Sequence, residues 1–279
     1  MVDSVKLNDS TSIPQLGFGT YLVPPEETVA TVAAALEVGY RHIDTAQMYG
    51  NEAQVGEAVA ASGIARDDIY LTSKLNNSKH GRDDVLRSFD ETLEKLKVDR
   101  LDLFLIHWPL PTRYDGDFVA TWKAMLELKE DGRLTSVGVS NFQPDHLQQI
   151  VDATGVAPAV NQIEAHPYFR NDAARLASHE HAIAVEAWGP LGQGAVLKDA
   201  VIGEIAAETG RAASQVILRW HLQRGDIIFP KSMRRERMEE NFAIFDFTLN
   251  DEQVSRIDAL DQGAAGRVGP DPDTFDWIG

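Results

Sequence analysis

Residues 101–109 read LDLFLIHWP, a run that is apolar from position 101 to 106 except at Asp102 and then turns polar at His107. A short apolar run of this kind is typical of a strand that is covered on both faces, as in a parallel sheet. The segment Phe118–Asp131 follows with a helical pattern that stops at Gly132. The pair therefore predicts one strand and one crossover helix of an α/β protein.

The same alternation recurs along the whole chain. We expect strands at Leu16–Thr20, His42–Ala46, Ile69–Leu75, Leu101–Trp108, Ser136–Ser140, Val160–Glu164, Ala182–Trp188 and Ile227–Pro230. We expect helices at Pro25–Val38, Asn51–Ser62, Arg82–Lys97, Phe118–Asp131, Pro144–Thr154, Asp172–His179, Val201–Thr209 and Arg235–Phe242. Eight strands each followed by a helix predict an α/β protein of the (β/α)₈ TIM-barrel type, with an extra hairpin over residues 4–13 ahead of it.

A doubly wound sheet is the main competing fold. It usually carries the pattern G-x-G-x-x-G after its first strand, but residues 17–22 read GFGTYL and lack the third glycine. We therefore expect a single barrel domain over residues 1–279, which is an ordinary length for this architecture.

The composition excludes several classes of function. The chain has 26 Lys and Arg against 43 Asp and Glu, a net charge of −17, so phosphate repels it and general binding to nucleic acid or anionic membranes is excluded. It has no cysteine, which excludes disulfides, thiolate metal sites and cysteine nucleophiles. With no secretory signal and no apolar stretch long enough to span a membrane, we expect a cytoplasmic monomer that acts on a small molecule and holds no metal.

Four polar residues lie at or just after the ends of three neighbouring predicted strands: Asp44, Tyr49, Lys74 and His107. Taken singly, each is more often a packing or solvated residue than a catalytic one. In a barrel, however, the carboxyl ends of the strands meet at one mouth, where active sites lie. Four such side chains at one mouth predict an active site.

These residue types suggest proton transfer to a carbonyl oxygen. The pKa of a tyrosine is ordinarily about 10, and a nearby ammonium such as Lys74 is expected to lower it. Asp44 would hold Lys74 charged by an ion pair, and His107 would orient the carbonyl oxygen, which leaves Tyr49 as the general acid. With no metal or covalent nucleophile in evidence, this chemistry needs a separate hydride donor.

Several motifs resemble the aldo-keto reductase family. They are GFGT at 17–20, GYRHIDTA at 39–46 with YGNE at 49–52, GVSNF at 138–142, VNQ at 160–162 and IFPKS at 228–232. They cover essentially the whole chain in the family's order, and WGPLGQG at 188–194 and FPKSMRRER at 229–237 are similar to bacterial 2,5-diketo-D-gluconate reductases. The resemblance implies a barrel, NADPH-dependent reduction of aldehydes and ketones, and the same tetrad of Asp44, Tyr49, Lys74 and His107.

The resemblance also implies a cofactor site. The matching residues are Gly19, Thr20, Asp44, Ser140, Asn141, Gln162, Trp188, Gly189, Leu191, Gly192, Lys231, Ser232, Met233, Arg234, Arg237, Glu240 and Asn241. Amide and hydroxyl groups at 140, 141 and 162 would hold the nicotinamide carboxamide, and Trp188 would stack on its ring. The basic run from 231 to 237 would bind a 2′-phosphate, which favours NADP over NAD, with Arg235 outside the contact and residues 240 and 241 near the adenosine.

The substrate pocket departs from the family at one position. Many members carry Trp where this chain has Asn76, so we expect a wider and more polar pocket that admits bulky carbonyl compounds. The alternative is that Asn76 turns away and a neighbouring indole fills the space. The expected pocket residues are Tyr21, Met48, Asn76, Trp108 and Trp277, with the tail 271–279 as a loop over the pocket.

Two other functions are open at this point. One is a nucleotide-binding regulatory barrel that resembles the family's potassium-channel β subunits, although a complete tetrad argues for retained chemistry. The other is a Schiff-base lyase or aldolase that uses Lys74, which an Asp44 ion pair opposes because it keeps the amine charged.

Overall fold

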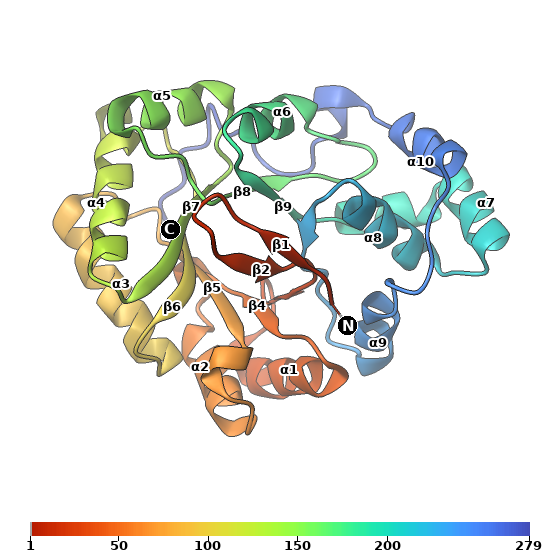
Figure 1. Ribbon diagram of the computed structural model, residues 1–279, viewed down its shortest axis with the longest axis horizontal. Helices are drawn as coiled ribbons and strands as arrows, with labels where there is room; N and C mark the ends of the chain where they lie inside the picture. Colours follow the sequence, from red (N-terminus) through yellow and green to blue (C-terminus); the bar gives the residue numbers. More distant parts are fainter. Residues whose placement is uncertain (1) are drawn as a thin grey trace.

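The computed structural model describes residues 2–279 and confirms the barrel. The parallel strands run in the order β3 to β10, as Figure 1 shows. Their bounds are β3 Phe18–Gly19, β4 His42–Asp44, β5 Tyr70–Leu75, β6 Leu101–Ile106, β7 Leu134–Ser140, β8 Val160–Glu164, β9 Ala184–Trp188 and β10 Ile227–Ile228. A parallel bridge between Leu16 and Ile228 joins the first strand to the last and closes the barrel.

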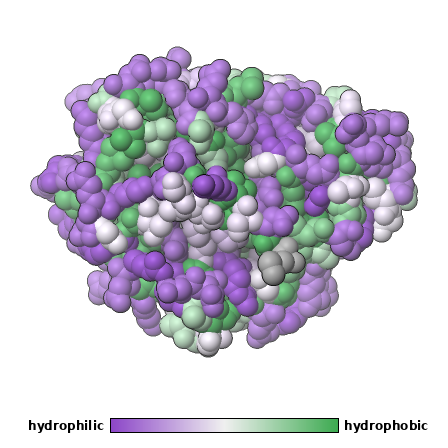
Figure 2. Space-filling view, viewed as in Figure 1, coloured by the Kyte–Doolittle hydropathy of each residue, from purple (hydrophilic) through white to green (hydrophobic). Residues whose placement is uncertain are grey.

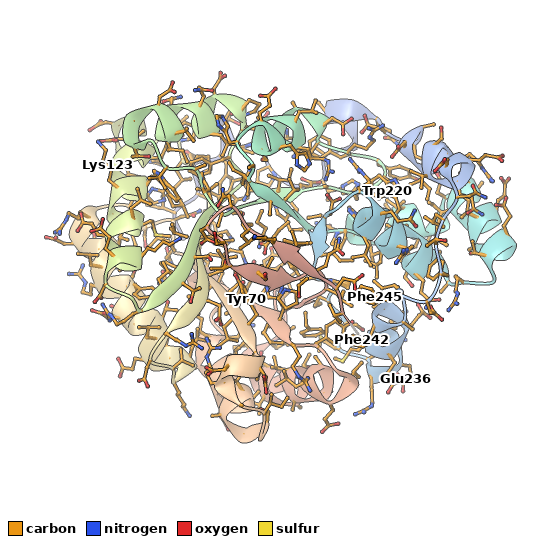
Figure 3. All side chains as sticks on the ribbon, viewed as in Figure 1. Tyr70, Lys123, Trp220, Glu236, Phe242 and Phe245 are labelled. Atoms are coloured by element: carbon orange, nitrogen blue, oxygen red, sulfur yellow. The ribbon has the colours of Figure 1, made fainter. Side chains whose placement is uncertain are left out.

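A hairpin covers the amino-terminal end of the barrel, as expected. Its strands are β1 Ser4–Lys6 and β2 Ser12–Pro14, which lie across the middle of the helix ring in Figure 1. Ile13, fully buried, packs with Leu103 and Leu105 from inside the barrel. Tyr70, at the start of β5, packs against the same cluster and lies close to the hairpin in Figure 3. Because this end is plugged with apolar side chains, only the opposite end of the barrel is open to ligands.

The ring of helices agrees with the expected ranges to within one or two residues. These are α1 Pro25–Val38, α2 Glu52–Ala61, α3 Arg82–Leu96, α4 Phe118–Glu130, α5 Pro144–Thr154, α6 Asp172–Glu180, α7 Ala200–Thr209 and α9 Arg235–Phe242. Figure 2 shows that the outer surface of this ring is mostly hydrophilic, in keeping with the high charge of the chain. Among residues 2–279, no helix is long and apolar enough to span a membrane.

Two helices were not expected from the sequence: α8 Ala213–Gln223 and α10 Asp251–Asp258. The helix that packs on β10 is α8, whereas α7 packs on α8 and α10. Trp220, labelled in Figure 3, is completely buried in α8 and anchors a cluster shared by these helices. The expectation of one helix after each strand placed a single helix between β9 and β10, where the structure has both α7 and α8.

One close helix contact depends on a glycine. A Cβ added to Gly56 in α2 would lie 2.5 Å from the backbone of Leu96, at the end of α3. Backbone atoms cannot rotate away as a side chain does, so any substitution must push the two helices apart.

We therefore expect Gly56→Ala to lower the free energy of unfolding by about 1–3 kcal/mol. The matched control is Gly203→Ala in α7, where an added Cβ has no neighbour within 4 Å. This control should raise stability by about 0.5–1 kcal/mol through helix propensity and a less flexible unfolded chain. Urea unfolding of both variants measures the difference, and equal effects would contradict the steric account.

Candidate active site

The centre of the mouth is a buried lysine. Lys74 is the penultimate residue of β5, which pairs with β4, the strand that carries Asp44, and the two side chains are essentially inaccessible to solvent. The Lys74 Nζ donates to Asp44 Oδ1 at 2.7 Å, to the Thr45 carbonyl at 2.9 Å and to the Tyr49 hydroxyl at 3.2 Å. The three donated bonds satisfy all three N–H groups of the ammonium.

The ion-pair and hydrogen-bond partners of Lys74 keep its amine protonated. Burial alone would lower the pKa of Lys74, but the opposite charge of Asp44 and the hydrogen bonds to Asp44 and Tyr49 outweigh it and raise the pKa. The amine is therefore an ammonium at neutral pH. An ammonium cannot act as the nucleophile that a Schiff-base mechanism needs.

Tyr49 lies on the short 3₁₀ turn Gln47–Tyr49 directly after β4. Burial raises the pKa of Tyr49 to about 12, and the nearby Lys74 lowers it only in part. The expectation that Lys74 leaves the tyrosine with a lowered pKa is therefore wrong, because desolvation of the phenolate outweighs the attraction of the ammonium. The phenol keeps its proton at neutral pH and hydrogen-bonds to a cation, so it is able to donate that proton.

His107 follows β6, and its ring centre lies 5.8 Å from that of Tyr49 at a steep angle. Burial and the charge of Lys74 lower the pKa of His107 well below its ordinary value, so the imidazole is neutral. Its Nδ1 is buried and has no partner among the described residues. A neutral imidazole carries one N–H, which is available to a ligand oxygen.

The residues expected at the nicotinamide end lie together at the mouth. The Trp188 indole donates to Asn141 Oδ1 at 2.8 Å, and the Asn141 amide donates to the His107 carbonyl at 3.0 Å. The Ser140 hydroxyl donates to the Gln162 carbonyl at 2.8 Å. Four strands are thus cross-linked by polar groups next to the tetrad.

The glycine-rich loop 189–194 after β9 also allows a ligand to approach its backbone closely. Gly189 and Gly192 have positive φ angles of 61° and 54°, a conformation that favours glycine. Leu191 between them packs into the core, which holds the loop against the barrel. Directly after β3, the Thr20 hydroxyl donates to the Asp44 carbonyl at 3.1 Å, and a Cβ on Gly19 would lie 2.9 Å from the Phe229 carbonyl.

The basic segment after β10 divides into paired and unpaired cations. Arg235 forms ion pairs with Glu37 and Glu239, so its guanidinium is already engaged. In contrast, three exposed cations make no ion pair with any described residue: Lys231, Arg234 and Arg237. Ser232 and the exposed Met233 lie between them. A cluster of unpaired cations in a chain of charge −17 is a local site for an anion.

Two residues expected near the adenosine are engaged with the protein. The Glu240 carboxylate accepts a hydrogen bond from Ser214 at 2.5 Å, and Asn241 is a buried residue of α9.

The pocket rim is largely aromatic. Tyr21 is 58% exposed and packs on Tyr49 with ring centres 5.1 Å apart. Trp108 packs on Phe275 of the tail at 4.2 Å. The tail does cross this region, since Asn77 donates to the Trp277 carbonyl at 2.9 Å.

The Asn76 side chain is engaged within its own loop. Its side-chain oxygen accepts hydrogen bonds from the Ser78 backbone at 2.9 Å and the Ser78 hydroxyl at 2.8 Å, so the amide shapes its own loop. The half-buried Met48 lies on the turn beside the tetrad.

Sequence reasoning missed two buried glutamates. Glu164 at the end of β8 accepts backbone hydrogen bonds from Val268 at 2.6 Å and Gly269 at 2.9 Å, which holds the final segment across Trp188. Glu186, inside the barrel on β9, accepts from Gln162 at 2.7 Å. A charged residue within the otherwise apolar run AVEAW was the available signal for Glu186.

The ionisation of Glu186 predicts a dependence of stability on pH. Burial raises the pKa of Glu186 from its ordinary 4.5 to about 8. Between these values the unfolded chain has lost this proton and the folded protein retains it, so stability falls as pH rises. Glu186→Gln removes this contribution, and its advantage over wild type in urea unfolding should grow from pH 5 to pH 8. Parallel stability profiles for the two proteins would contradict the assignment.

Known proteins resemble this chain over its full length. The model of the Aldo/keto reductase family matches residues 15–262. An aldo-keto reductase of Mycobacterium sp. (strain KMS) is 49% identical, over 99% of this chain and 98% of the relative. The methylglyoxal reductase DkgA of Salmonella typhimurium is 43% identical, over 97% of each.

One of the similar solved structures contains a bound nucleotide. A mutant of Gox0644 in complex with NADPH superposes with a TM-score of 0.95 and 43% identity, covering 99% of this chain and 100% of that one. The match of a family model to most of the chain, together with relatives near one-half identity, decides the classification. This chain belongs to the aldo/keto reductase family.

Proposed function

We propose that this protein reduces aldehydes and ketones to alcohols, with NADPH as hydride donor and Tyr49 as proton donor. The observation that carries the proposal is the bonding of one buried ammonium, Lys74 Nζ, to both Asp44 and the Tyr49 hydroxyl. A phenol that donates a proton to a carbonyl oxygen becomes a phenolate. Lys74 lies where it stabilises that developing negative charge.

Each residue has a separate task in this reaction. The neutral His107 donates its one N–H to the substrate oxygen and so orients the carbonyl toward Tyr49. Asp44 keeps Lys74 charged, and the aromatic rim restricts water at the mouth. NADPH, when bound, supplies the hydride that the chain itself cannot.

The residues present fit that cofactor. Ser140, Asn141 and Gln162 carry the hydroxyl and amide groups that suit a carboxamide, and the half-buried Trp188 offers an aromatic face beside them. The glycine loop 189–194 brings backbone N–H groups to the same edge, where a pyrophosphate would bind. The unpaired cations Lys231, Arg234 and Arg237 match a 2′-phosphate.

For the substrate, we propose small dicarbonyl compounds and keto-sugars. The curated relatives include enzymes named methylglyoxal reductase, and a small 2-oxoaldehyde is the first compound to assay. The regulatory alternative has no support, because the tetrad is assembled and relatives with high identity are named as reductases.

We further propose that the enzyme is a single domain over residues 1–279 and works in the cytoplasm as a monomer, without nucleic-acid partners. These statements stay predictions. The excess of acidic residues supports the last of them, since nucleic acid carries the same sign of charge.

We expect Tyr49→Phe to lower kcat for carbonyl reduction by roughly 10²–10⁴-fold, the usual range for one general acid. The phenyl ring remains but the proton is gone, so the Kd for NADPH, measured by cofactor fluorescence, should stay unchanged. Tyr168→Phe is the control, because its hydroxyl donates to Asp199 and to none of the tetrad residues. Turnover of Tyr49→Phe near that of wild type would exclude Tyr49 as the acid.

We expect Arg237→Ala to weaken NADPH binding roughly 10- to 100-fold, because a charge-assisted hydrogen bond to phosphate contributes about 1.5–3 kcal/mol. NADH, which lacks the 2′-phosphate, should change far less. Arg235→Ala is the matched control, since that guanidinium is already paired with Glu37 and Glu239. Titration of both variants with both nucleotides measures the effect, and equal losses for NADPH and NADH would remove the assignment.

A further inference from the structure

Glu186 is a fully buried carboxyl group that the reaction above does not use. It lies on β9 beside Gln162 of β8, since the two residues are register partners in the parallel sheet. Its Oε2 accepts a hydrogen bond from Gln162 Nε2 at 2.7 Å, and its Oε1 is buried with no partner among the described residues. Burying a carboxyl group with so few partners costs free energy of folding, and the hydrogen bond to Gln162 is the one that its side chain makes within residues 2–279.

The amide of Gln162 is held from two sides. Its Nε2 also donates to Asp44 Oδ2 at 2.9 Å, so its two N–H groups are committed to two carboxyl groups. The remaining polar atom, Oε1, accepts no hydrogen bond from the described residues. The amide therefore offers a ligand only its carbonyl oxygen.

This orientation is enforced by charge. Asp44 is the ion-pair partner of Lys74 through its other oxygen, so Oδ2 is a carboxylate oxygen that accepts and cannot donate. A flipped Gln162 would point its carbonyl oxygen at this carboxylate, which repels it, and would lose the hydrogen bond to Asp44. A second acceptor on the opposite side, Glu186, keeps the second N–H from the mouth.

We propose that Glu186 is a positioning residue, which fixes the Gln162 amide so that its carbonyl oxygen accepts from the carboxamide N–H of bound NADPH. The inference rests on the proposed function, because it takes NADPH as the ligand at Gln162. It adds a residue from inside the barrel that contacts neither substrate nor cofactor.

Gln162 requires a hydrogen-bond acceptor at residue 186, and that acceptor does not need to be charged. Burial raises the pKa of Glu186 to about 8, so the group is mostly a neutral acid at pH 7. The carbonyl oxygen of a neutral acid still accepts from Gln162. A glutamine at this position keeps such an oxygen, whereas a methionine of similar length does not.

The test compares Glu186→Gln with Glu186→Met at pH 7, with NADP⁺ and 2′-phospho-ADP-ribose as probes. The second probe retains the phosphates and adenosine but lacks the nicotinamide. We expect Glu186→Met to weaken NADP⁺ roughly tenfold and to leave 2′-phospho-ADP-ribose unchanged, as loss of one orienting hydrogen bond predicts. Glu186→Gln should restore NADP⁺ binding to within about twofold of wild type.

Three results would overturn the proposal: unchanged NADP⁺ binding by Glu186→Met, equal losses for both probes, or a loss in Glu186→Gln as large as in Glu186→Met. Glu52→Met is the matched control, because Glu52 is a buried carboxyl that accepts from Ser73 at 2.6 Å. It should cost stability without separating the two probes. Wild-type turnover of methylglyoxal with NADPH tests the reductase function independently.

Wild-type protein supplies a second test if Glu186→Met does not fold. In protein labelled with ¹⁵N-glutamine, the Gln162 side-chain signals are assigned by their loss in Gln162→Leu. Both amide protons should be protected from exchange without ligand and stay so with NADP⁺, since the cofactor takes the carbonyl oxygen. Loss of protection, or a proton that changes partner on NADP⁺ binding, would contradict the proposal.

Discussion

The buried ion pair between Lys74 and Asp44 is the interaction on which the rest of the mouth depends. Removing an ammonium and a carboxylate from water costs several kcal/mol for each ion, so such a pair persists only when every remaining polar group has a partner. The structure meets this condition: Lys74 also bonds to Thr45 and Tyr49, and Asp44 also accepts from Gln162. Asp44, Tyr49, Lys74 and Gln162 are therefore one connected network of hydrogen bonds that forms or fails as a unit.

The barrel makes this network possible by joining residues from distant parts of the chain. Lys74 and Asp44 are on adjacent strands, whereas Gln162 and Glu186 come from the far side of the barrel. The terminal strands β3 and β10 are only two residues long, so closure relies on hydrogen bonds such as Gly17 N–H to Ile228 O at 2.8 Å. Without closure, the Asp44 carboxylate would lose the Gln162 amide that occupies its second oxygen.

Electrostatics separates the chemical end of the site from the nucleotide end. At the tetrad, burial makes each charge depend on a close partner, as the opposite pKa shifts of Lys74 and His107 show. At the basic segment the cations are exposed and most acidic neighbours are already engaged, as with Glu239 and Arg235. The site thus combines a buried region for proton transfer with a solvent-exposed cationic surface for an anion.

The sequence by itself determined the barrel, the hairpin and the residues at the mouth. Strand ends in a barrel meet at one edge, so position along the chain is enough to predict that Asp44, Lys74 and His107 converge. The motifs at 138–142 and 228–232 resemble those of the aldo-keto reductase family, and this resemblance predicted NADPH as the cofactor. Helix α8 was missed because the expected pattern of one helix after each strand left no place for a second helix between β9 and β10.

Only the tertiary structure decided the protonation of Tyr49, the direction of Asn76 and the environment of Glu186. Each depends on how much water a side chain loses and which atoms replace it, and both quantities are set by segments distant in sequence. Burial raised the pKa of Tyr49 although Lys74 lies beside it, and hydrogen bonds to Ser78 hold Asn76 within its own loop. The register of β8 and β9 placed Glu186 against Gln162, since parallel pairing puts residues of adjacent strands side by side.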